Sequence, residues 1–461
     1  MTRRFHLRTF GCQMNEHDSE RIAGLLAAEG FEPTDDVEEA DVVVLNTCCV
    51  REHADQRLYG HLGHLKALKE RRPDLQIAVG GCLAQKDREL IRERAGHVDV
   101  VFGTHNLGRT ATLLEQARLE GPIVEIVEEH EAYPSALPAR REVDHSAWVT
   151  IQIGCDNSCT FCIVPIVRGA EVSRRLGDVV REVEELAADG VTEITLLGQN
   201  VNSYGRDLGA GQYRPRFADL LRAVDAVDGI RRVRFTSPHP KDLRPETIEA
   251  MAECESVCPH LHLPLQAGSD RVLARMHRGY TAERYLERLT AARAAIPDLA
   301  VTTDLIVGFP GETEEDFLAT LEVVDEAAYD AAYTFVFSPR PGTPAAEMTD
   351  ELVPAEVAQD RLARLVETVE RHALARHRSR IGRVEEVLVE GPSKKDPEVL
   401  SGRTGQHKLV HFRPLGGIDL PAGSYAEVGV TDAAPHWLRG ELVRRTAAPR
   451  RARVRIPLTV E

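Results

Sequence analysis

The sequence predicts an α/β protein with three units: a doubly wound parallel sheet, a central partial (β/α)6 barrel and a small C-terminal β-barrel. Short apolar strands alternate with helical segments over the first two units, which is the pattern of parallel sheets. Short strands separated by Gly and Pro turns follow near the C-terminus, as in small barrels. At 461 residues the chain is too long for a single hydrophobic core.

The first unit, residues 1–120, shows this alternation most clearly. We expect its strands at 5–10, 41–45, 75–79 and 98–102, and its helices at 16–29, 52–71 and 86–94. The second strand, Asp-Val-Val-Val-Leu, is almost continuously apolar, which is typical of a strand buried on both faces. Helices are therefore expected on both sides of the sheet.

Three cysteines of this unit, Cys12, Cys48 and Cys82, each follow the carboxyl end of a different expected strand. Ligands bind at that edge of open α/β sheets, so the three thiols are expected to converge. We call them the N-terminal cysteines and expect them to hold an iron–sulfur cluster with one open iron. The alternative is that each is a buried structural residue. Cys49 is expected to point away from Cys48 and to bind nothing.

Residues 121–140 lack periodicity and contain prolines among charged residues, so we expect a linker with one short strand at 123–127. The central unit, residues 141–379, contains six expected strands and ends in a long helix at about 354–380. The strands are expected at 148–153, 193–197, 232–235, 260–265, 301–307 and 333–337. Six βα units without a seventh predict a partial barrel, whose site lies at the carboxyl ends of its strands. Thr313 and Asp316 are expected to form a capping box.

The loop after the first barrel strand contains Cys155, Cys159 and Cys162, which we call the loop cysteines. Their C-x-x-x-C-x-x-C spacing suits three corners of a cubane iron–sulfur cluster and leaves one iron without a protein ligand. A zinc site usually needs four ligands, often in two pairs, and no second pair follows closely. We therefore expect a [4Fe–4S] cluster that takes part in chemistry. Cys254 and Cys258 have no third partner nearby and are expected to be structural.

Composition limits the remaining possibilities. Residues 380–447 form the third unit and residues 448–461 a basic tail; together they carry 14 basic and 10 acidic side chains, although the whole chain has a net charge of −16. A basic end on an acidic body fits phosphate or RNA binding, and the alternative is a passive cap. No apolar run predicts a membrane span and no signal sequence is visible. Nine cysteines, most of them grouped as ligands, fit a reducing cytoplasm.

The cysteine loop resembles the signature of the radical S-adenosylmethionine (SAM) superfamily, and the whole chain resembles its methylthiotransferase family. The segment at 196–205 resembles the MiaB type, which modifies tRNA. Ile166 stands where many relatives have an aromatic residue and Ala267 where Ser is frequent, but neither is a cluster ligand. The matching segments are 9–15, 45–48, 80–82, 154–162 with Pro165 and Arg168-Gly169, 302–313 and 402–404.

The resemblance implies conversion of N(6)-isopentenyladenosine, next to the anticodon of tRNA, to its 2-methylthio derivative. The loop cysteines would hold the [4Fe–4S] cluster that cleaves SAM to a 5′-deoxyadenosyl radical. The N-terminal cysteines would hold an auxiliary [4Fe–4S] cluster that presents the sulfur, and the third unit would be a TRAM domain. Gln199, Asn200 and Gly308 are expected to contact SAM, and no catalytic side chain is expected beyond the cluster ligands.

The implied partners are a tRNA anticodon stem-loop that carries isopentenyladenosine and a flavodoxin- or ferredoxin-like electron donor. The enzyme is expected to be a cytoplasmic monomer that does not associate with membranes. Two other functions stay open at this point: methylthiolation of a ribosomal-protein aspartate, and a non-catalytic iron–sulfur regulator that binds RNA. Nucleoside analysis of tRNA tests the first alternative, and formation of 5′-deoxyadenosine tests the second.

Overall fold

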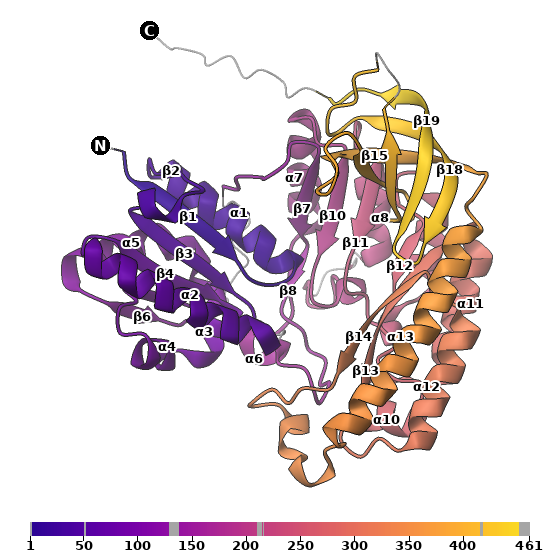
Figure 1. Ribbon diagram of the computed structural model, residues 1–461, viewed down its shortest axis with the longest axis horizontal. Helices are drawn as coiled ribbons and strands as arrows, with labels where there is room; N and C mark the ends of the chain where they lie inside the picture. The colour runs from indigo at the N-terminus through magenta and orange to yellow at the C-terminus, as the bar shows by residue number, and fades with distance from the viewer. Residues whose placement is uncertain are drawn as a thin grey trace.

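The computed structural model describes residues 2–49, 52–128, 138–209, 214, 216–414 and 418–450. Figure 1 shows the N-terminal sheet on one side, the central strands with helices on their outer side, and the yellow C-terminal barrel at one end of the central unit. Much of the predicted linker and most of the predicted basic tail lie outside the described residues. Within those residues, no helix is both long enough and apolar enough to cross a membrane.

The N-terminal unit is a parallel sheet with helices on both faces, as predicted, and every residue of its two central strands is buried. In spatial order the strands are β2 (Glu32–Pro33), β1 (Arg4–Thr9), β3 (Val42–Thr47), β4 (Gln76–Gly81), β5 (Val100–Phe102) and β6 (Ile123–Glu125). One face is covered by α1 (Gln13–Ala28) and α5 (Thr110–Glu120), and the other by α2 (Glu52–Arg71), α3 (Cys82–Asp87) and α4 (Glu89–Arg94).

Two elements of this unit differ from the sequence prediction. The single helix expected at 86–94 is two short helices, α3 and α4, which meet at Arg88. Arg88 has a φ of +51°, and a right-handed helix cannot continue through that conformation. The short strand expected inside the linker is β6, which pairs with β5 at the edge of the sheet.

The central unit contains six parallel strands in chain order, which form two three-stranded sheets joined by a bridge between Val233 and Val257. The strands are β7 (Ser146–Thr150), β10 (Glu193–Leu197), β11 (Arg232–Phe235), β12 (His260–His262), β13 (Ala300–Val307) and β14 (Ala331–Val336). The helices that pack on them are α7 (Leu176–Ala188), α8 (Phe217–Asp225), α9 (Pro245–Glu253), α10 (Asp270–Arg275), α11 (Ala282–Ala295), α12 (Glu314–Ala327) and α13 (Ala355–Arg378). The sheets end at β7 and β14, so the partial barrel is confirmed.

The first barrel strand is shorter than predicted. The strand expected at 148–153 ends at Thr150, and β8 (Gln152–Ile153) then leaves the barrel to pair antiparallel with β9 (Val172–Ser173). This β8–β9 clasp closes the segment that carries the loop cysteines. A second expectation holds, since Thr313 and Asp316 form a reciprocal capping box at the start of α12.

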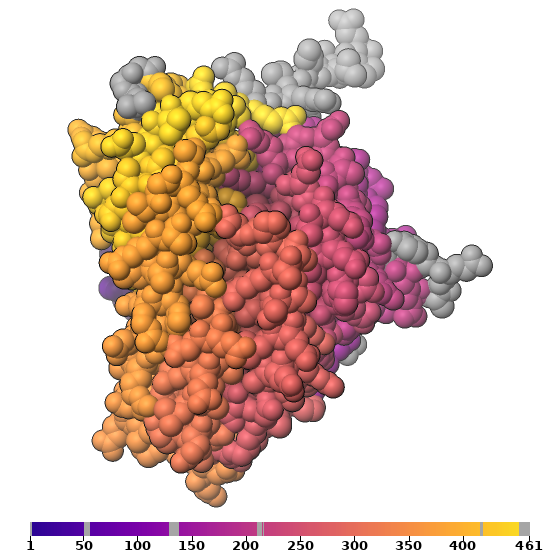
Figure 2. Space-filling model, turned by 90° about the vertical axis from the view of Figure 1, so that its right-hand side faces the viewer, coloured from indigo at the N-terminus to yellow at the C-terminus, as the bar shows by residue number. Residues whose placement is uncertain are grey.

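The C-terminal unit is a closed five-stranded barrel with an apolar interior, as the sequence predicts. Its strands are β15 (Val384–Pro392), β16 (Leu400–Thr404), β17 (Leu409–Arg413), β18 (Tyr425–Ala434) and β19 (Trp437–Ala447). In the space-filling view of Figure 2 this barrel packs directly against one end of the central unit.

The C-terminal barrel covers the amino-terminal ends of the central strands. Arg232 and Arg234 of β11 donate four hydrogen bonds, of 2.7 to 2.9 Å, to backbone carbonyls of that barrel. Lys408 of the barrel pairs at 2.5 Å with Asp330, which precedes β14. Deletion of the C-terminal unit would remove these partners from three buried charged groups, of which Arg234 would keep Glu193. Such a deletion therefore tests folding as well as RNA binding.

Replacing Lys408 by alanine should destabilise the protein by about 3–5 kcal/mol, because the buried Asp330 carboxylate loses its counter-charge. The two side chains are only 4% and 10% exposed. Thermal unfolding should show a clear fall in the midpoint. As a control, Arg444→Ala removes an exposed pair with Glu427 and should leave the midpoint almost unchanged. Equal falls in both variants would contradict the role of burial.

Candidate functional site

The N-terminal cysteines lie at the carboxyl ends of three adjacent strands, β1, β3 and β4. Cys12 caps α1, Cys48 directly follows β3, and Cys82 is the first residue of α3. The Cys12 and Cys48 thiols share a hydrogen bond, which is the main cause of a Cys12 pKa lowered to about 6. The pKa of Cys82 is lowered, mainly by a hydrogen bond with Cys49, and the nearby charge of Cys12 opposes that shift. The structure therefore places the three residues at one edge of the sheet, although no group of three His, Cys, Asp or Glu side chains among the described residues is arranged to hold a metal ion.

Close backbone contacts explain the residues that flank these cysteines. Gly11 precedes Cys12, and a Cβ there would lie 2.8 Å from the Cβ of Cys48. Gly81 has a φ of +93°, and a Cβ there would lie 2.5 Å from the Thr47 carbonyl oxygen. Only glycine fits at these two positions, so the glycines allow the three loops to meet.

Asparagine side chains tie the same loops together. The Asn15 amide donates to the Thr47 carbonyl at 3.1 Å, and the Asn46 amide donates to the Asn15 carbonyl at 2.8 Å. Both asparagines are completely buried. The loops that carry the N-terminal cysteines are therefore fixed by the protein itself, before any cluster is considered.

Cys49 lies beside Cys82, which the sequence argument did not foresee. Its thiol shares a hydrogen bond with Cys82, which raises the pKa of Cys49 and lowers that of Cys82. The expectation that Cys49 points away from Cys48 and binds nothing stays a prediction, but the side chain lies beside another of the N-terminal cysteines.

The loop cysteines lie inside the segment closed by the β8–β9 clasp. The Cys155 amide donates to the Gly169 carbonyl at 3.1 Å, and the Cys162 amide donates to the Cys159 carbonyl at 3.0 Å. Burial raises the pKa of the Cys155 thiol and raises that of Cys162 to about 12. Because burial opposes the thiolate form, these groups ionise most readily when they bind a cation. This donor set suits an iron–sulfur cluster.

Arg278 is a functional residue that the sequence analysis missed. Its buried guanidinium donates to the Cys159 sulfur at 3.3 Å, to the Pro264 carbonyl at 3.2 Å and to the Tyr280 hydroxyl at 3.1 Å. It therefore ties the cysteine loop to the segment after β12. A single arginine, far from Cys159 in the sequence, belongs to no local pattern that could have revealed it.

Arg168 links the two cysteine sites. It ends α6 (Val164–Arg168), shortly after the loop cysteines, and forms a buried 2.7 Å ion pair with Asp18 of α1. Its charge also lowers the pKa values of Cys12 and Cys82. Nearby, Met14 packs against Ile153 and Leu197 in a small apolar cluster between the units. Figure 1 shows α1, α6 and β8 at this junction, so both sites border one interface.

Replacing Arg168 by methionine should cost about 3–5 kcal/mol in the free energy of unfolding, because Asp18 is left buried and unpaired. The double variant Arg168→Met with Asp18→Leu removes both charges and should recover most of that loss. Urea unfolding of protein prepared without iron separates this effect from cluster binding. A double variant as unstable as the single one would show that the unpaired carboxylate is not the cause.

The residues expected to contact SAM lie at the carboxyl ends of the central strands, in different surroundings. Asn200 is buried, and its amide donates to Asp242 at 2.8 Å. Gln199 has a buried Oε1 with no hydrogen-bond partner among the described residues. Gly308 donates its N–H to Glu312, and a Cβ there would lie 2.9 Å from that of Ala358 in α13. Contact of these three residues with SAM stays a prediction.

Further buried polar atoms near Gln199 also have no partner within the described part of the chain. They are Gln152 Oε1, Glu171 Oε1 and His239 Nε2. The Gln152 amide donates to Ser203 at 3.1 Å, and the His239 N–H donates to Asn200 at 3.3 Å. Buried polar atoms left without partners usually face a ligand or water. The region therefore fits a polar ligand such as SAM, and the sequence carried no signal for these atoms.

The two residues that depart from the family pattern lie in different environments. Ile166 is 53% exposed on α6, and Ala267 is buried in the loop before α10. Cys254 and Cys258 are also buried, and Cys254 belongs to the main hydrophobic core of the central unit. Their burial agrees with the structural role expected for both.

Three family models match the chain in succession. The Uncharacterized protein family UPF0004 matches residues 4–103, the Radical SAM superfamily matches residues 149–324, and the TRAM domain matches residues 378–443. The order of these matches follows the three units of the structure.

Curated relatives named tRNA-2-methylthio-N(6)-dimethylallyladenosine synthase match nearly the whole chain, and two of them serve as examples. The protein of Acidothermus cellulolyticus is 57% identical over 453 residues, which cover 97% of this chain and 90% of the relative. That of Mycolicibacterium smegmatis is 54% identical over 443 residues, 95% of this chain and 86% of the relative. A solved structure of the radical SAM methyltransferase TsrM from Kitasatospora setae has a TM-score of 0.55 at 17% identity, covers 75% of this chain and 74% of TsrM, and shows a shared fold.

Proposed function

The chain belongs to the tRNA-2-methylthio-N(6)-dimethylallyladenosine synthases, a family of radical SAM tRNA methylthiotransferases, and from this premise we propose the roles of its residues. The protein is an enzyme that methylthiolates N(6)-isopentenyladenosine in tRNA. The observation that carries the residue assignments is the placement of two three-cysteine sets at one interface. A ribosomal-protein aspartate and a purely regulatory role are both disfavoured by the names of the relatives.

The loop cysteines would hold one [4Fe–4S] cluster, and the N-terminal cysteines would hold a second. When bound, the first cluster supplies the electron that cleaves SAM and the second supplies the sulfur. The protein fixes the geometry of both sites. Arg278 holds the Cys159 sulfur in place, and the β8–β9 clasp keeps the loop folded. Arg168 supplies the positive charge that favours thiolates at Cys12 and Cys82.

The unpartnered polar atoms of Gln199, Gln152 and Glu171 would orient SAM beside the loop cysteines. Burial raises the pKa of Glu171, so a ligand amine nearby would favour its ionised form. Asn200 would act less directly, because its amide is already committed to Asp242. These roles divide the site into groups that hold SAM and groups that shape the pocket around it.

The partners follow from this chemistry. A tRNA anticodon stem-loop that carries isopentenyladenosine is the proposed substrate, since carbon 2 of a stacked adenine is hard to reach. A flavodoxin- or ferredoxin-like protein would deliver the electrons. We also propose that the enzyme works as a cytoplasmic monomer, with the domain boundaries predicted from the sequence.

Anaerobic reconstitution with iron and sulfide tests the two-cluster proposal. About eight irons per chain would support two cubanes, whereas about four would leave only one. Incubation of the reduced enzyme with SAM and isopentenyladenosine-containing tRNA tests the reaction itself. The products to measure are 5′-deoxyadenosine and the 2-methylthio nucleoside, and the absence of either would overturn the proposal.

A further inference from the structure

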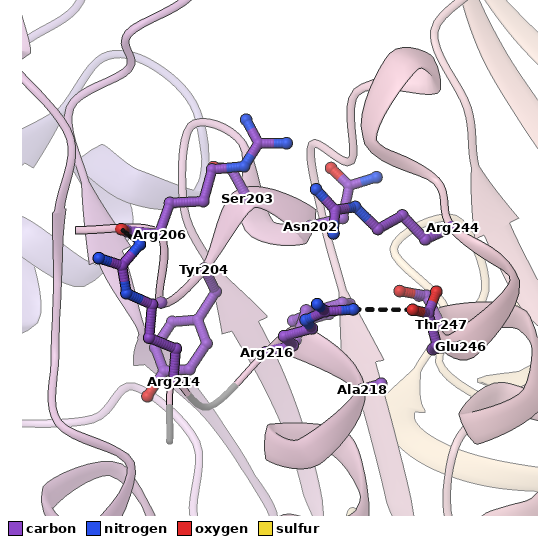
Figure 3. Close-up of a pocket in the computed structure, with 12 residues that line it drawn as sticks. Asn202, Ser203, Tyr204, Arg206, Arg214, Arg216, Ala218, Arg244, Glu246 and Thr247 are labelled. Carbon is purple, nitrogen blue, oxygen red and sulfur yellow. Dashed lines mark hydrogen bonds and ion pairs between the residues drawn. The ribbon is translucent and has the colours of Figure 1, made fainter. Parts of the chain in front are cut away.

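A basic cavity of about 420 Å³ lies outside the two cysteine sites, at the carboxyl-terminal rim of the central barrel. Its walls come from η3 (Val201–Ser203) with the turn after it, and from the beginnings of α8 and α9. Figure 3 shows four arginines around it, which come from these different segments: Arg206, Arg214, Arg216 and Arg244. Among the described lining residues, Glu246 is the one acidic side chain. The cavity is therefore cationic.

Two of the four arginines are paired with carboxylates. Arg206 binds the buried carboxylate of Asp242, and Arg216 binds Glu246 at 2.7 Å across the gap between α8 and α9. These pairs hold the two guanidinium groups at the cavity wall. Each guanidinium has five N–H donors, so the pair with a carboxylate leaves some of them free to bind a ligand.

The other two arginines are not neutralised. Arg214 makes a long 3.5 Å hydrogen bond to the Arg206 carbonyl. The Arg244 side chain is exposed and has no hydrogen-bond or ion-pair partner in the described ranges of the chain. Two positive charges therefore remain at the cavity without a counter-charge from the protein, and an anion is the ligand that such a site accepts.

The two helices add to the same preference. Arg216 and Arg244 are the residues that precede the first turns of α8 and α9, and residues of both first turns line the cavity. The N-terminal end of a helix carries a partial positive charge and unpaired backbone N–H groups. Asp219 and Glu246, in the first turns of α8 and α9, offset part of that charge, so the arginines carry most of the preference for a phosphate group.

The distribution of charge over the rest of the chain supports a role for this cavity in binding a polyanion. The chain has a net charge of −16, and six of the ten basic side chains of residues 380–447 take part in ion pairs; Lys394, Lys395, Arg439 and Arg445 do not among the described residues. A polyanion needs cations that are still free to replace its counterions. The ion pairs in and around the C-terminal barrel are Arg380–Glu385, Arg383–Asp298, Arg403–Glu390, Lys408–Asp330, Arg413–Glu398 and Arg444–Glu427.

The cavity is also connected to the proposed SAM region. Asp242 accepts a hydrogen bond from Asn200 with one oxygen and binds Arg206 with the other. Ser203, in the cavity wall, accepts a hydrogen bond from Gln152 at 3.1 Å. A ligand in the cavity would therefore lie beside the residues that surround the reacting groups.

We propose that this cavity binds backbone phosphates of the substrate tRNA and so fixes the position of the nucleotide that is modified. The proposal rests on the proposed function, because it assigns the phosphate chemistry to tRNA. A free nucleotide has the same phosphate chemistry, so the test separates the two sources. Arg244 supplies an unpaired positive charge, and Arg216 supplies the guanidinium donors that its pair with Glu246 leaves free.

The test compares the full-length reconstituted enzyme with the double variant Arg216→Gln and Arg244→Gln. The dissociation constant for isopentenyladenosine-containing tRNA should rise about tenfold near physiological salt, and the KM for tRNA should rise with it. The slope of log affinity against log salt should fall by about 1 to 2, as expected for the loss of one or two phosphate contacts. The same affinity and slope in both proteins would overturn the proposal.

Arg222→Gln is the matched control, because Arg222 pairs with Glu253 at 3.0 Å between the same two helices but does not line the cavity. This variant should bind tRNA like the wild type, and an equal loss in it would overturn the proposal. Adenosine 5′-monophosphate tests whether the cavity binds a free nucleotide instead of tRNA. If the double variant loses binding of this nucleotide but keeps its affinity for tRNA, the proposal is overturned. If the wild type binds tRNA through this cavity but makes no methylthiolated product, the site stands and the proposed function fails.

Discussion

Replacing Cys159 by alanine should abolish cleavage of SAM to 5′-deoxyadenosine. Two thiolates cannot hold a cubane that is built for three protein ligands, so the cluster of the central barrel is lost. Arg278 also loses the Cys159 sulfur as a hydrogen-bond acceptor, although it keeps its contacts with Pro264 and Tyr280. Product analysis under reducing, anaerobic conditions should show 5′-deoxyadenosine below the detection limit.

Cys254→Ala provides the matched control for this experiment. Cys254 is a buried cysteine of the same unit, but it belongs to the hydrophobic core rather than to the cysteine loop. The control variant should lose some stability and still cleave SAM. Normal 5′-deoxyadenosine formation by the Cys159 variant would show that the loop cysteines do not hold the cluster that cleaves SAM.

Replacing all three N-terminal cysteines by alanine should stop methylthio transfer while SAM cleavage continues. The central barrel and the loop cysteines are unchanged in this variant, so its own cluster should still form. Iron content should fall by about half, from about eight to about four per chain. Single replacements should be as damaging as the triple one, because each removes a ligand from the same cluster.

Cys49→Ala is informative beside these variants, because the Cys49 thiol contacts that of Cys82. We expect it to keep methylthiolation and its full iron content. If Cys49→Ala loses one cluster and Cys82→Ala does not, the assigned ligand set is wrong. If the triple variant still forms methylthiolated tRNA, the N-terminal unit does not carry the cluster that presents sulfur.

Much of the fold could be predicted because the relevant signals are local. Apolar strands alternate with helices through both α/β units, and the strand ends place Cys12, Cys48 and Cys82 at one sheet edge. The departures have no local signal. The strand expected through Ile153 stays apolar to its end, and only its pairing with β9 takes the last two residues out of the barrel. Arg88 interrupts a helix without Gly or Pro to mark the position.

The parts of the site that the sequence did not reveal depend on contacts between distant segments. Arg278 meets Cys159 across the barrel, and Arg168 meets Asp18 across the boundary between two units. Each is a single arginine among many. The charge of the C-terminal unit can be counted in the sequence, but only the structure shows which of its basic side chains are in ion pairs. Because many of them are paired, the cavity at α8 and α9 is the site that we propose for phosphate.

The β8–β9 clasp has a consequence for how the enzyme acquires its iron. Closing a flexible loop of about 18 residues, such as the one between β8 and β9, costs about 2.5 kcal/mol in chain entropy. The β8–β9 pairing closes this loop when the polypeptide folds, before a cluster binds. The loop would therefore be closed in the metal-free chain as well, and a cluster would enter a site whose two ends are already fixed by the polypeptide.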